Sequence, residues 1–227
     1  MSEVSYAFTA LVDVLGYRYR LDSDRRNGSL AFKDSLQAAL QSLSTINESV
    51  CSYQAISDTI ILSCPHREMF VDFLGMLKSV QIAFLKQGLF VRGGIAFAPH
   101  FKSNTVTYSH AVALAYELES KVAIYPRLVV DHNIIEMLRE SNEIESLIQT
   151  ELIAVSNGVH FLNIIDQNNW SMLWGFAGDL YSRERQFLER KEVEFAKHSW
   201  FEQYLLASAH RPQDVVRYVP GISALSF

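Results

Sequence analysis

The amino-acid sequence predicts an α+β fold in which two strand–helix–strand units share one sheet. Apolar runs of strand length, rich in β-branched and aromatic residues, alternate with segments whose apolar residues recur at helical spacing. Their order along the chain is strand, helix, strand, strand, helix, strand, which is the split βαβ arrangement. We therefore expect one sheet with helices on one of its faces.

The first unit begins with a near-continuous apolar run, residues 6–15, which predicts a strand buried on both faces. Asp13 lies near the end of this strand, and Gly16 ends it. The polar stretch 22–28 predicts a loop, and Ser29 is a suitable N-cap for the helix that follows. That helix carries apolar residues at helical spacing, namely Leu30, Leu36, Leu40 and Leu43.

Two short strand-like runs, 53–55 and 58–62, predict a tight β-hairpin that presents Asp58. A helical period follows over 69–85, and residues 89–98 return to strand character with two glycines inside. Because glycine weakens a strand, we expect a backbone or a ligand to approach closely there. These elements complete the arrangement known as ferredoxin-like.

Later segments extend this core. We expect a helix over 110–119, a strand over 128–130, a helix over 133–139 and a strand over 159–164. Residues 171–210 predict a long, charged helical segment with interleaved aromatic residues, interrupted near Gly178. We interpret residues 1–227 as a single domain, with a core over about 5–165 and a C-terminal helical extension over about 170–210.

Composition excludes several classes of function. An apolar fraction of 49% in 227 residues supports a substantial core and argues against disorder. A net charge of −5 gives no general attraction to nucleic acid. Cys51 and Cys64 are too few for a disulfide scaffold, and no secretion signal or membrane span is evident, so we expect a cytoplasmic protein with reduced thiols and no membrane partner.

Asp13 and Asp58 are the strongest candidates for chemistry, because one ends a buried strand and the other lies at the turn of a hairpin in the same sheet. Two converging carboxylates suit Mg²⁺ or Mn²⁺ bound to a triphosphate, since these ions are shared between one or two carboxylates and the phosphates. Taken singly, each residue is better explained as a structural carboxylate of a loop or turn. Together and in this order, they favour a metal site.

The segment after Asp13 offers further ligands. The Val14 carbonyl can face the metal, and Gly16 and Tyr17 lie in a turn whose successive amide groups can bind phosphate. Arg18 and Arg20 can reach a triphosphate, although charged residues after a strand more often lie in solvent.

Four motifs in order resemble the class III adenylate and guanylate cyclases. FTALVDVLGY is similar to their first metal motif, ISDTIIL to their second metal hairpin, VRGGIAF to the next strand and HAVALAYELES to the helix after it. Together with YPRLVVD, the VRGGI strand and the AYELES helix resemble in particular the pyrimidine cyclases (PycC) of Pycsar antiphage defence. The resemblance covers roughly residues 6–131.

This resemblance implies a homodimer with two active sites at its interface, which converts UTP or CTP into the 3′,5′-cyclic nucleotide and pyrophosphate. It places Asp13 and Asp58 on the metal carboxylates and Val14 on the backbone ligand. Its base-reading positions fall near Tyr53 and Gln54, and near Val106 and Thr107. None of these is the Lys or Asp of adenylate cyclases, which disfavours ATP. The shorter pyrimidine ring can be stacked by Tyr53 and hydrogen-bonded by Gln54, with UTP as the first expectation and CTP as the alternative. The product is expected to act on a separate effector.

The chain also departs from the family. Ala113 and Glu117 occupy the positions of the transition-state Asn and Arg of purine cyclases. Arg92, Arg18 or Lys102 can supply the missing positive charge, with a slight preference for Arg92, although an Arg in a central strand more often pairs with a structural carboxylate. A purine cyclase, and a degenerate cyclase-like module that only binds nucleotide or dimerises, stay open as alternatives.

Overall fold

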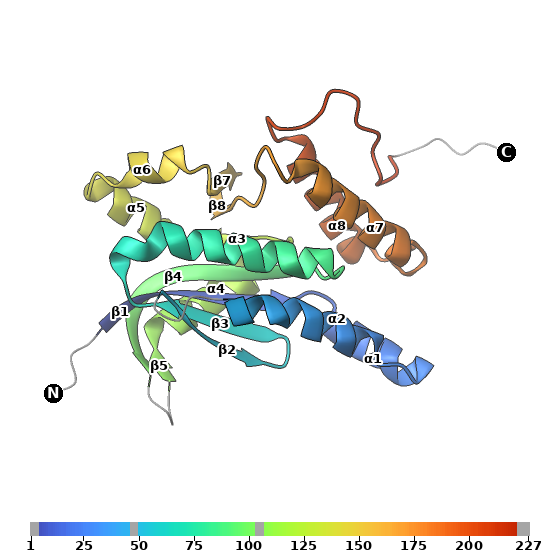
Figure 1. Cartoon of the computed structure of the whole chain (residues 1–227), viewed down its shortest axis with the longest axis horizontal. Coiled ribbons are helices and arrows are strands. Elements are labelled where there is room, and N and C mark those ends of the chain that lie inside the picture. The colour runs from blue at the N-terminus through green and yellow to red at the C-terminus, as the bar shows by residue number, and fades with distance from the viewer. Residues whose placement is uncertain (1–4, 46–49, 103–106, 222–227) are drawn as a thin grey trace. The chain divides into compact units, whose positions relative to one another are not determined.

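The computed structural model describes residues 5–45, 50–102 and 107–221 of the chain, shown in Figure 1. The chain divides into two compact units, Met1–Ile164 and Ile165–Phe227. Among the described residues, none of the helices is both long enough and apolar enough to cross a bilayer.

The first unit contains one mixed sheet and the helices connected to it. Its strands are β1 (Ser5–Val14), β2 (Ser52–Ile56), β3 (Thr59–Cys64), β4 (Val91–Lys102), β5 (Thr107–Ser109), β6 (Leu128–Val130), β7 (Ile153–Ser156) and β8 (Val159–Leu162). Its helices are α1 (Tyr17–Asn27), α2 (Ala31–Leu40), α3 (Phe70–Lys86), α4 (His110–Lys121), α5 (His132–Glu140) and α6 (Ile144–Gln149), with two 3₁₀ segments, η1 (Gln41–Thr45) and η2 (Arg67–Met69).

The strand order confirms the predicted α+β fold. The sheet runs β2-β3-β1-β4-β6-β8-β7, with β5 paired to β4 outside this path. Its first four strands are antiparallel neighbours in the order that the split βαβ arrangement requires. Strand β6 then joins β4 in parallel, and the β7–β8 hairpin extends the sheet at that side.

Helices cover both faces of the sheet, so the expectation of helices on one face was wrong (Figure 1). On one face, Phe8 of β1 stacks on Phe70 of α3, with ring centroids 4.3 Å apart. On the other face, Leu11 of β1 packs with Ala115 of α4. Helix α4 can lie this close because Gly94 of β4 has no side chain: a Cβ there would be 2.3 Å from the Ala115 carbonyl oxygen.

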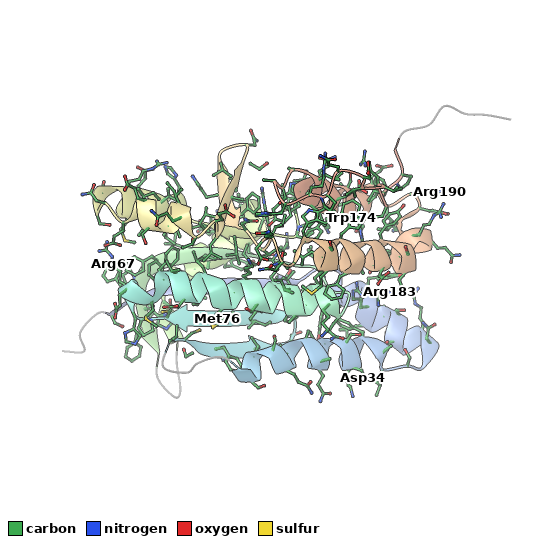
Figure 2. The ribbon with its side chains drawn as sticks, turned by 45° about the horizontal axis from the view of Figure 1, so that its top comes forward. Asp34, Arg67, Met76, Trp174, Arg183 and Arg190 are labelled. Atoms are coloured by element: carbon green, nitrogen blue, oxygen red, sulfur yellow. The ribbon has the colours of Figure 1, made fainter. Side chains whose placement is uncertain are left out.

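Helix α1 occupies most of the stretch that the sequence predicted as a loop. It has no buried residue, so it lacks the apolar period that identifies a helix. Asp24 of α1 also replaces Ser29 as the cap of α2, because its carboxylate accepts hydrogen bonds from the Phe32 and Lys33 amides and from the Ser29 hydroxyl. The outer side of α2, which carries Asp34, points away from the sheet (Figure 2).

The second unit consists of helices α7 (Trp170–Leu188) and α8 (Glu192–Leu206) and the segment after them. Helix α7 continues through Gly178, so the predicted interruption there was wrong, and the break comes at residues 189–191, where Arg190 has φ 65°. The Trp170 indole donates to the Leu205 carbonyl across the two helices (2.8 Å). The buried carboxylate of Glu202 accepts hydrogen bonds from Arg217 and from the Tyr218 and Val219 amides, which fixes the following segment on α8.

Candidate active site

The structure brings Asp13 and Asp58 together at one end of the central strands. Asp13 is the next-to-last residue of β1, opposite Thr59 of β3, and Asp58 lies in the β2–β3 turn directly before Thr59. The Val14 amide donates a hydrogen bond to the Asp58 carbonyl oxygen (3.1 Å), which ties the turn to the end of β1. Both side chains are half-buried, and the charge of Asp58 acts on the Asp13 carboxyl.

The β2–β3 turn is tight, because only Ser57 and Asp58 separate Ile56 from Thr59. Ser57 has φ 60°, in the left-handed region that a non-glycine residue seldom adopts. Short turns of this kind fix the register of a hairpin, and the register here sets the position of Asp58.

Arg92 of β4 is the positive charge beside these carboxylates. It lies opposite Asp13 in the β1–β4 register, and its Nε is 3.4 Å from Asp13 Oδ2. Its Nη2 forms an ion pair with Glu119 of α4, and its Nη1 donates to the Ala123 carbonyl (3.4 Å). The guanidinium is therefore held on three sides by protein oxygens.

Burial raises the pKa of Asp13 to about 6, and the negative charge of Glu119 adds to the rise. The positive charge of Arg92 opposes it, and the charge of Asp58 raises it further. A carboxyl group in this state loses its proton more readily when a further cation lies beside it.

The charges favour a divalent cation. Arg92 pairs with Asp13 and Glu119, and the charge of Asp58 also acts on Asp13, so two negative charges and one positive charge act on Asp13. Within the described residues, no three His, Cys, Asp or Glu side chains converge as a complete set of metal ligands. Two carboxylates suffice for Mg²⁺ or Mn²⁺ when phosphate oxygens and water complete the shell. The residues present thus fit a metal that arrives with a phosphorylated ligand.

The backbone after Asp13 forms the start of α1. Gly16 adopts φ 77° and is the N-cap residue of this helix, and the Tyr17 ring packs edge-on against Phe32 (5.3 Å). A helix start presents unpaired amide groups, which favour a phosphate. Val14, Gly16 and Tyr17 therefore lie where a triphosphate on Asp13 would meet backbone groups.

The predicted base-reading residues do not gather at this site within one chain. Tyr53 pairs with Leu62 and Gln54 with Ile61, so their side chains point to opposite faces of the edge strand β2. Through Ile61 and Leu11, Gln54 shares the face of Asp13, whereas Tyr53 lies on the α3 face.

Thr107 pairs with Lys102, ten residues along β4 from Arg92, which corresponds to roughly 30 Å along the strand. Val106 and the side chains of Thr107 and Lys102 lie outside the described residues.

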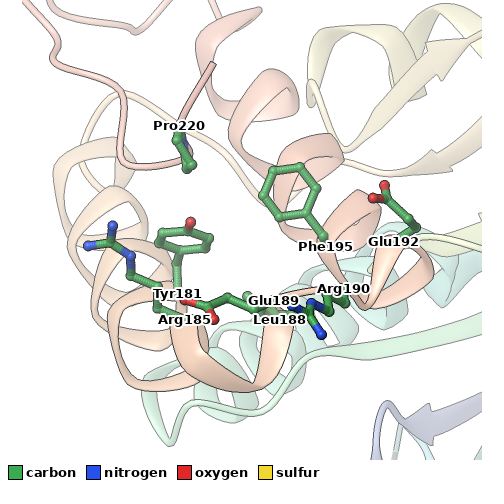
Figure 3. Close-up of a pocket in the computed structure, with 8 residues that line it drawn as sticks. All are labelled: Tyr181, Arg185, Leu188, Glu189, Arg190, Glu192, Phe195 and Pro220. Atoms are coloured by element: carbon green, nitrogen blue, oxygen red, sulfur yellow. The ribbon is translucent and has the colours of Figure 1, made fainter. Parts of the chain in front are cut away.

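A cavity of about 320 Å³ lies in the second unit (Figure 3). Its apolar lining comes from Tyr181, Leu188, Phe195 and Pro220, and its charged lining from Arg185, Arg190, Glu189 and Glu192. None of these is a predicted site residue, and their balanced charges select no ligand charge.

Glu119 is the residue that the sequence interpretation missed. It is 5% exposed and lies one helical turn after the buried Ala115. A carboxylate on the buried side of a helix signals a buried ion pair. The partner of Glu119 in this ion pair is Arg92 of the central strand β4.

Comparison with known proteins gives a likeness in structure only. No protein-family model matches the chain, and no curated protein matches it in sequence. Two solved structures of a bacterial light-regulated adenylyl cyclase are similar over 56% of this chain, with 12% identity and a TM-score of 0.36. The match spans 43% of the length of that cyclase.

The monomeric guanylyl cyclase domain of the RhoGC fusion protein from the aquatic fungus Blastocladiella emersonii is similar over 70% of this chain and 95% of its own. Its identity is 8% and its TM-score 0.41. Likeness at this level says nothing of the substrate or the reaction of this chain.

Proposed function

We propose that this chain is a nucleotidyl cyclase, which converts a nucleoside triphosphate into a 3′,5′-cyclic nucleotide and pyrophosphate. The observation that carries the proposal is the pair Asp13 and Asp58, fixed at the end of β1 by the hydrogen bond from the Val14 amide to the Asp58 carbonyl. Asp58 and Glu119 add negative charge around Asp13, and Arg92 balances only part of it, so Mn²⁺ or Mg²⁺ would neutralise the remainder. The resemblance of the sequence motifs of this chain to those of class III cyclases supports the same activity.

In the reaction, the ribose 3′-oxygen forms a bond to the α-phosphorus, and the bond from that phosphorus to the bridging oxygen of pyrophosphate breaks. The hydroxyl proton passes to solvent. A divalent metal, when bound, lowers the pKa of the hydroxyl and neutralises charge on the α-phosphate. Asp13, Asp58 and the Val14 carbonyl would hold that metal, while the amides at Gly16 and Tyr17 bind phosphate oxygens.

Arg92 is not the cation that we assign to the transition state, because Asp13, Glu119 and Ala123 already engage its guanidinium. Arg18 is exposed on the first turn of α1, and in the described part of the chain it forms no ion pair. We assign it to the triphosphate, where a guanidinium meets charge that develops during phosphoryl transfer.

We infer a pyrimidine substrate, UTP in first place and CTP as the alternative. Support comes from Gln54, which lies on the Asp13 face of the sheet and offers both a donor and an acceptor to a base edge. Because Thr107 is remote from Asp13 in the same chain, its use at the site requires a second copy, in line with a homodimer. A second messenger for antiphage defence, read by a separate effector, follows from the resemblance.

A module that binds nucleotide without turnover is the second candidate, because Ala113 and Glu117 on α4 provide neither the amide nor the guanidinium of purine cyclases. The test is to supply the purified protein with ATP, GTP, CTP or UTP and Mn²⁺ and to separate the products by chromatography. One dominant cyclic pyrimidine supports the proposal. A cyclic purine rejects the base preference, and binding of triphosphate without any product supports the binding module.

A further inference from the structure

Arg92 links two carboxylates that differ in exposure. The Asp13 side chain at the end of β1 is 22% exposed, whereas that of Glu119 on α4 is 6% exposed. The guanidinium directs Nε to Asp13 and Nη2 to Glu119, and the Ala123 carbonyl takes a hydrogen bond from Nη1. A planar guanidinium held by two hydrogen bonds and one ion pair has little freedom to rotate.

The fold brings Glu119 to this position by close packing of α4 on β4. Gly94 lies two residues after Arg92 on the same face, and a Cβ on it would be 2.5 Å from Leu118 Cβ. The absence of that atom lets the α4 turn that carries Leu118 and Glu119 lie directly on the strand. A buried carboxylate is costly unless it is paired, so its presence here calls for an explanation beyond packing.

We propose that Glu119 and Arg92 are positioning residues of the metal site: Glu119 fixes the guanidinium of Arg92, and the guanidinium fixes the carboxylate of Asp13 in the orientation that a divalent cation requires. This inference rests on the proposed function. Because Glu119 shares the positive charge of Arg92, the Asp13 carboxylate keeps net negative charge for a metal. With Glu119 neutral, Arg92 would be balanced by Asp13 alone and would compete with the cation.

The test is a titration of the metal-free protein with Mn²⁺ alone, followed by the electron paramagnetic resonance signal of free Mn²⁺. Glu119→Gln keeps the volume of the side chain and removes its charge. We expect Mn²⁺ to bind this variant roughly tenfold more weakly, as is typical when a group that orients a ligand is removed. The matched control is Glu136→Gln, which breaks the surface pair of Glu136 with Arg139 (2.6 Å) and should bind Mn²⁺ as the wild type does.

Turnover distinguishes positioning from catalysis. In Glu119→Gln, the Mn²⁺ concentration for half-maximal activity should rise by a similar factor, while kcat at saturating Mn²⁺ stays within about threefold of the wild type. Arg92→Lys gives a second route if the first variant does not fold, because a lysine keeps the charge but cannot reach both carboxylates in a fixed geometry. The double variant should lose no more Mn²⁺ affinity than the single variant that binds Mn²⁺ more weakly. This follows because Glu119 acts on Asp13 through Arg92.

Unchanged Mn²⁺ affinity in a folded Glu119→Gln or Arg92→Lys protein, with turnover intact, overturns this inference and leaves the proposed function standing. Wild-type protein that binds no Mn²⁺ and turns over no triphosphate overturns the proposed function, and the inference with it.

Discussion

Replacement of Asp13 by Asn should stabilise the metal-free protein, and by an amount that depends on pH. The folded structure raises the pKa of this carboxyl from 3.8 to about 6. A difference of one between the pKa values of the folded and unfolded states corresponds to about 1.4 kcal/mol, so ionised Asp13 costs the folded state up to about 3 kcal/mol at neutral pH. Asn keeps the shape of the neutral acid and avoids this cost.

The sign follows from proton binding. Between pH 4 and 6 the folded state holds a proton that the unfolded chain has released, so the stability of the wild type falls as pH rises through this range. Asp13→Asn lacks this dependence. The advantage of the variant in free energy of unfolding should therefore grow by about 2 to 3 kcal/mol from pH 4 to pH 7. Urea unfolding followed by circular dichroism, with a chelator present, measures it.

Asp34→Asn is the control, because it removes one carboxylate from the exposed side of α2. If the difference in stability between Asp13→Asn and the wild type stays constant with pH, the folded structure does not raise the pKa of Asp13. Adding Mn²⁺ at pH 7 should reverse the order, since a ligand that binds only the folded wild type stabilises it by mass action.

Three further predictions concern packing and base recognition. Gly94→Ala should destabilise the protein by about 1 to 3 kcal/mol in urea unfolding, because its Cβ would lie 2.3 Å from the Ala115 carbonyl oxygen. Gly75→Ala on α3 should not destabilise the protein, because there is open space around that position. Equal effects of the two substitutions would contradict the close packing of α4. Glu202→Ala should lower the free energy of unfolding by about 3 kcal/mol or more in thermal unfolding, since it leaves Arg217 and two amides without their acceptor. The same change should expose the segment after α8 to protease. A protease pattern like that of the wild type would contradict this role of Glu202. Gln54→Ala should raise the KM for UTP about tenfold, whereas Tyr53→Ala should leave it within about twofold, because of the two only Gln54 shares the face of Asp13. A larger rise in KM for Tyr53→Ala than for Gln54→Ala would show that the base lies elsewhere.

The sequence identified the core of the fold, because β1, the β2–β3 hairpin, α3 and β4 each carry a clear apolar period or run. It failed where no such period exists. Helix α1 buries no residue and depends on Gly16 at its start and on the contact of Asp24 with α2. Strand β7 has four residues, of which two are exposed and none is fully buried, so it shows no buried alternation.

For the candidate site, residue order along the chain was enough to place Asp13 and Asp58 at one end of one sheet. The environment of Arg92 could not be obtained in this way. Its partner Glu119 lies on a helix whose approach depends on Gly94, and only the packed structure shows which side of that helix faces the strand. Likewise, the pleat of β2 separates Tyr53 from Gln54.

If Asp13 and Asp58 together support metal-dependent cyclisation, product formation must depend on both carboxylates. The direct measurement compares wild type, Asp13→Asn and Asp58→Asn in UTP and Mn²⁺, with the cyclic product and pyrophosphate quantified after chromatography. The wild type should form a cyclic product, and each variant should lose at least about 100-fold in rate with its fold intact by circular dichroism. Product formation at the wild-type rate in either folded variant would contradict this dependence.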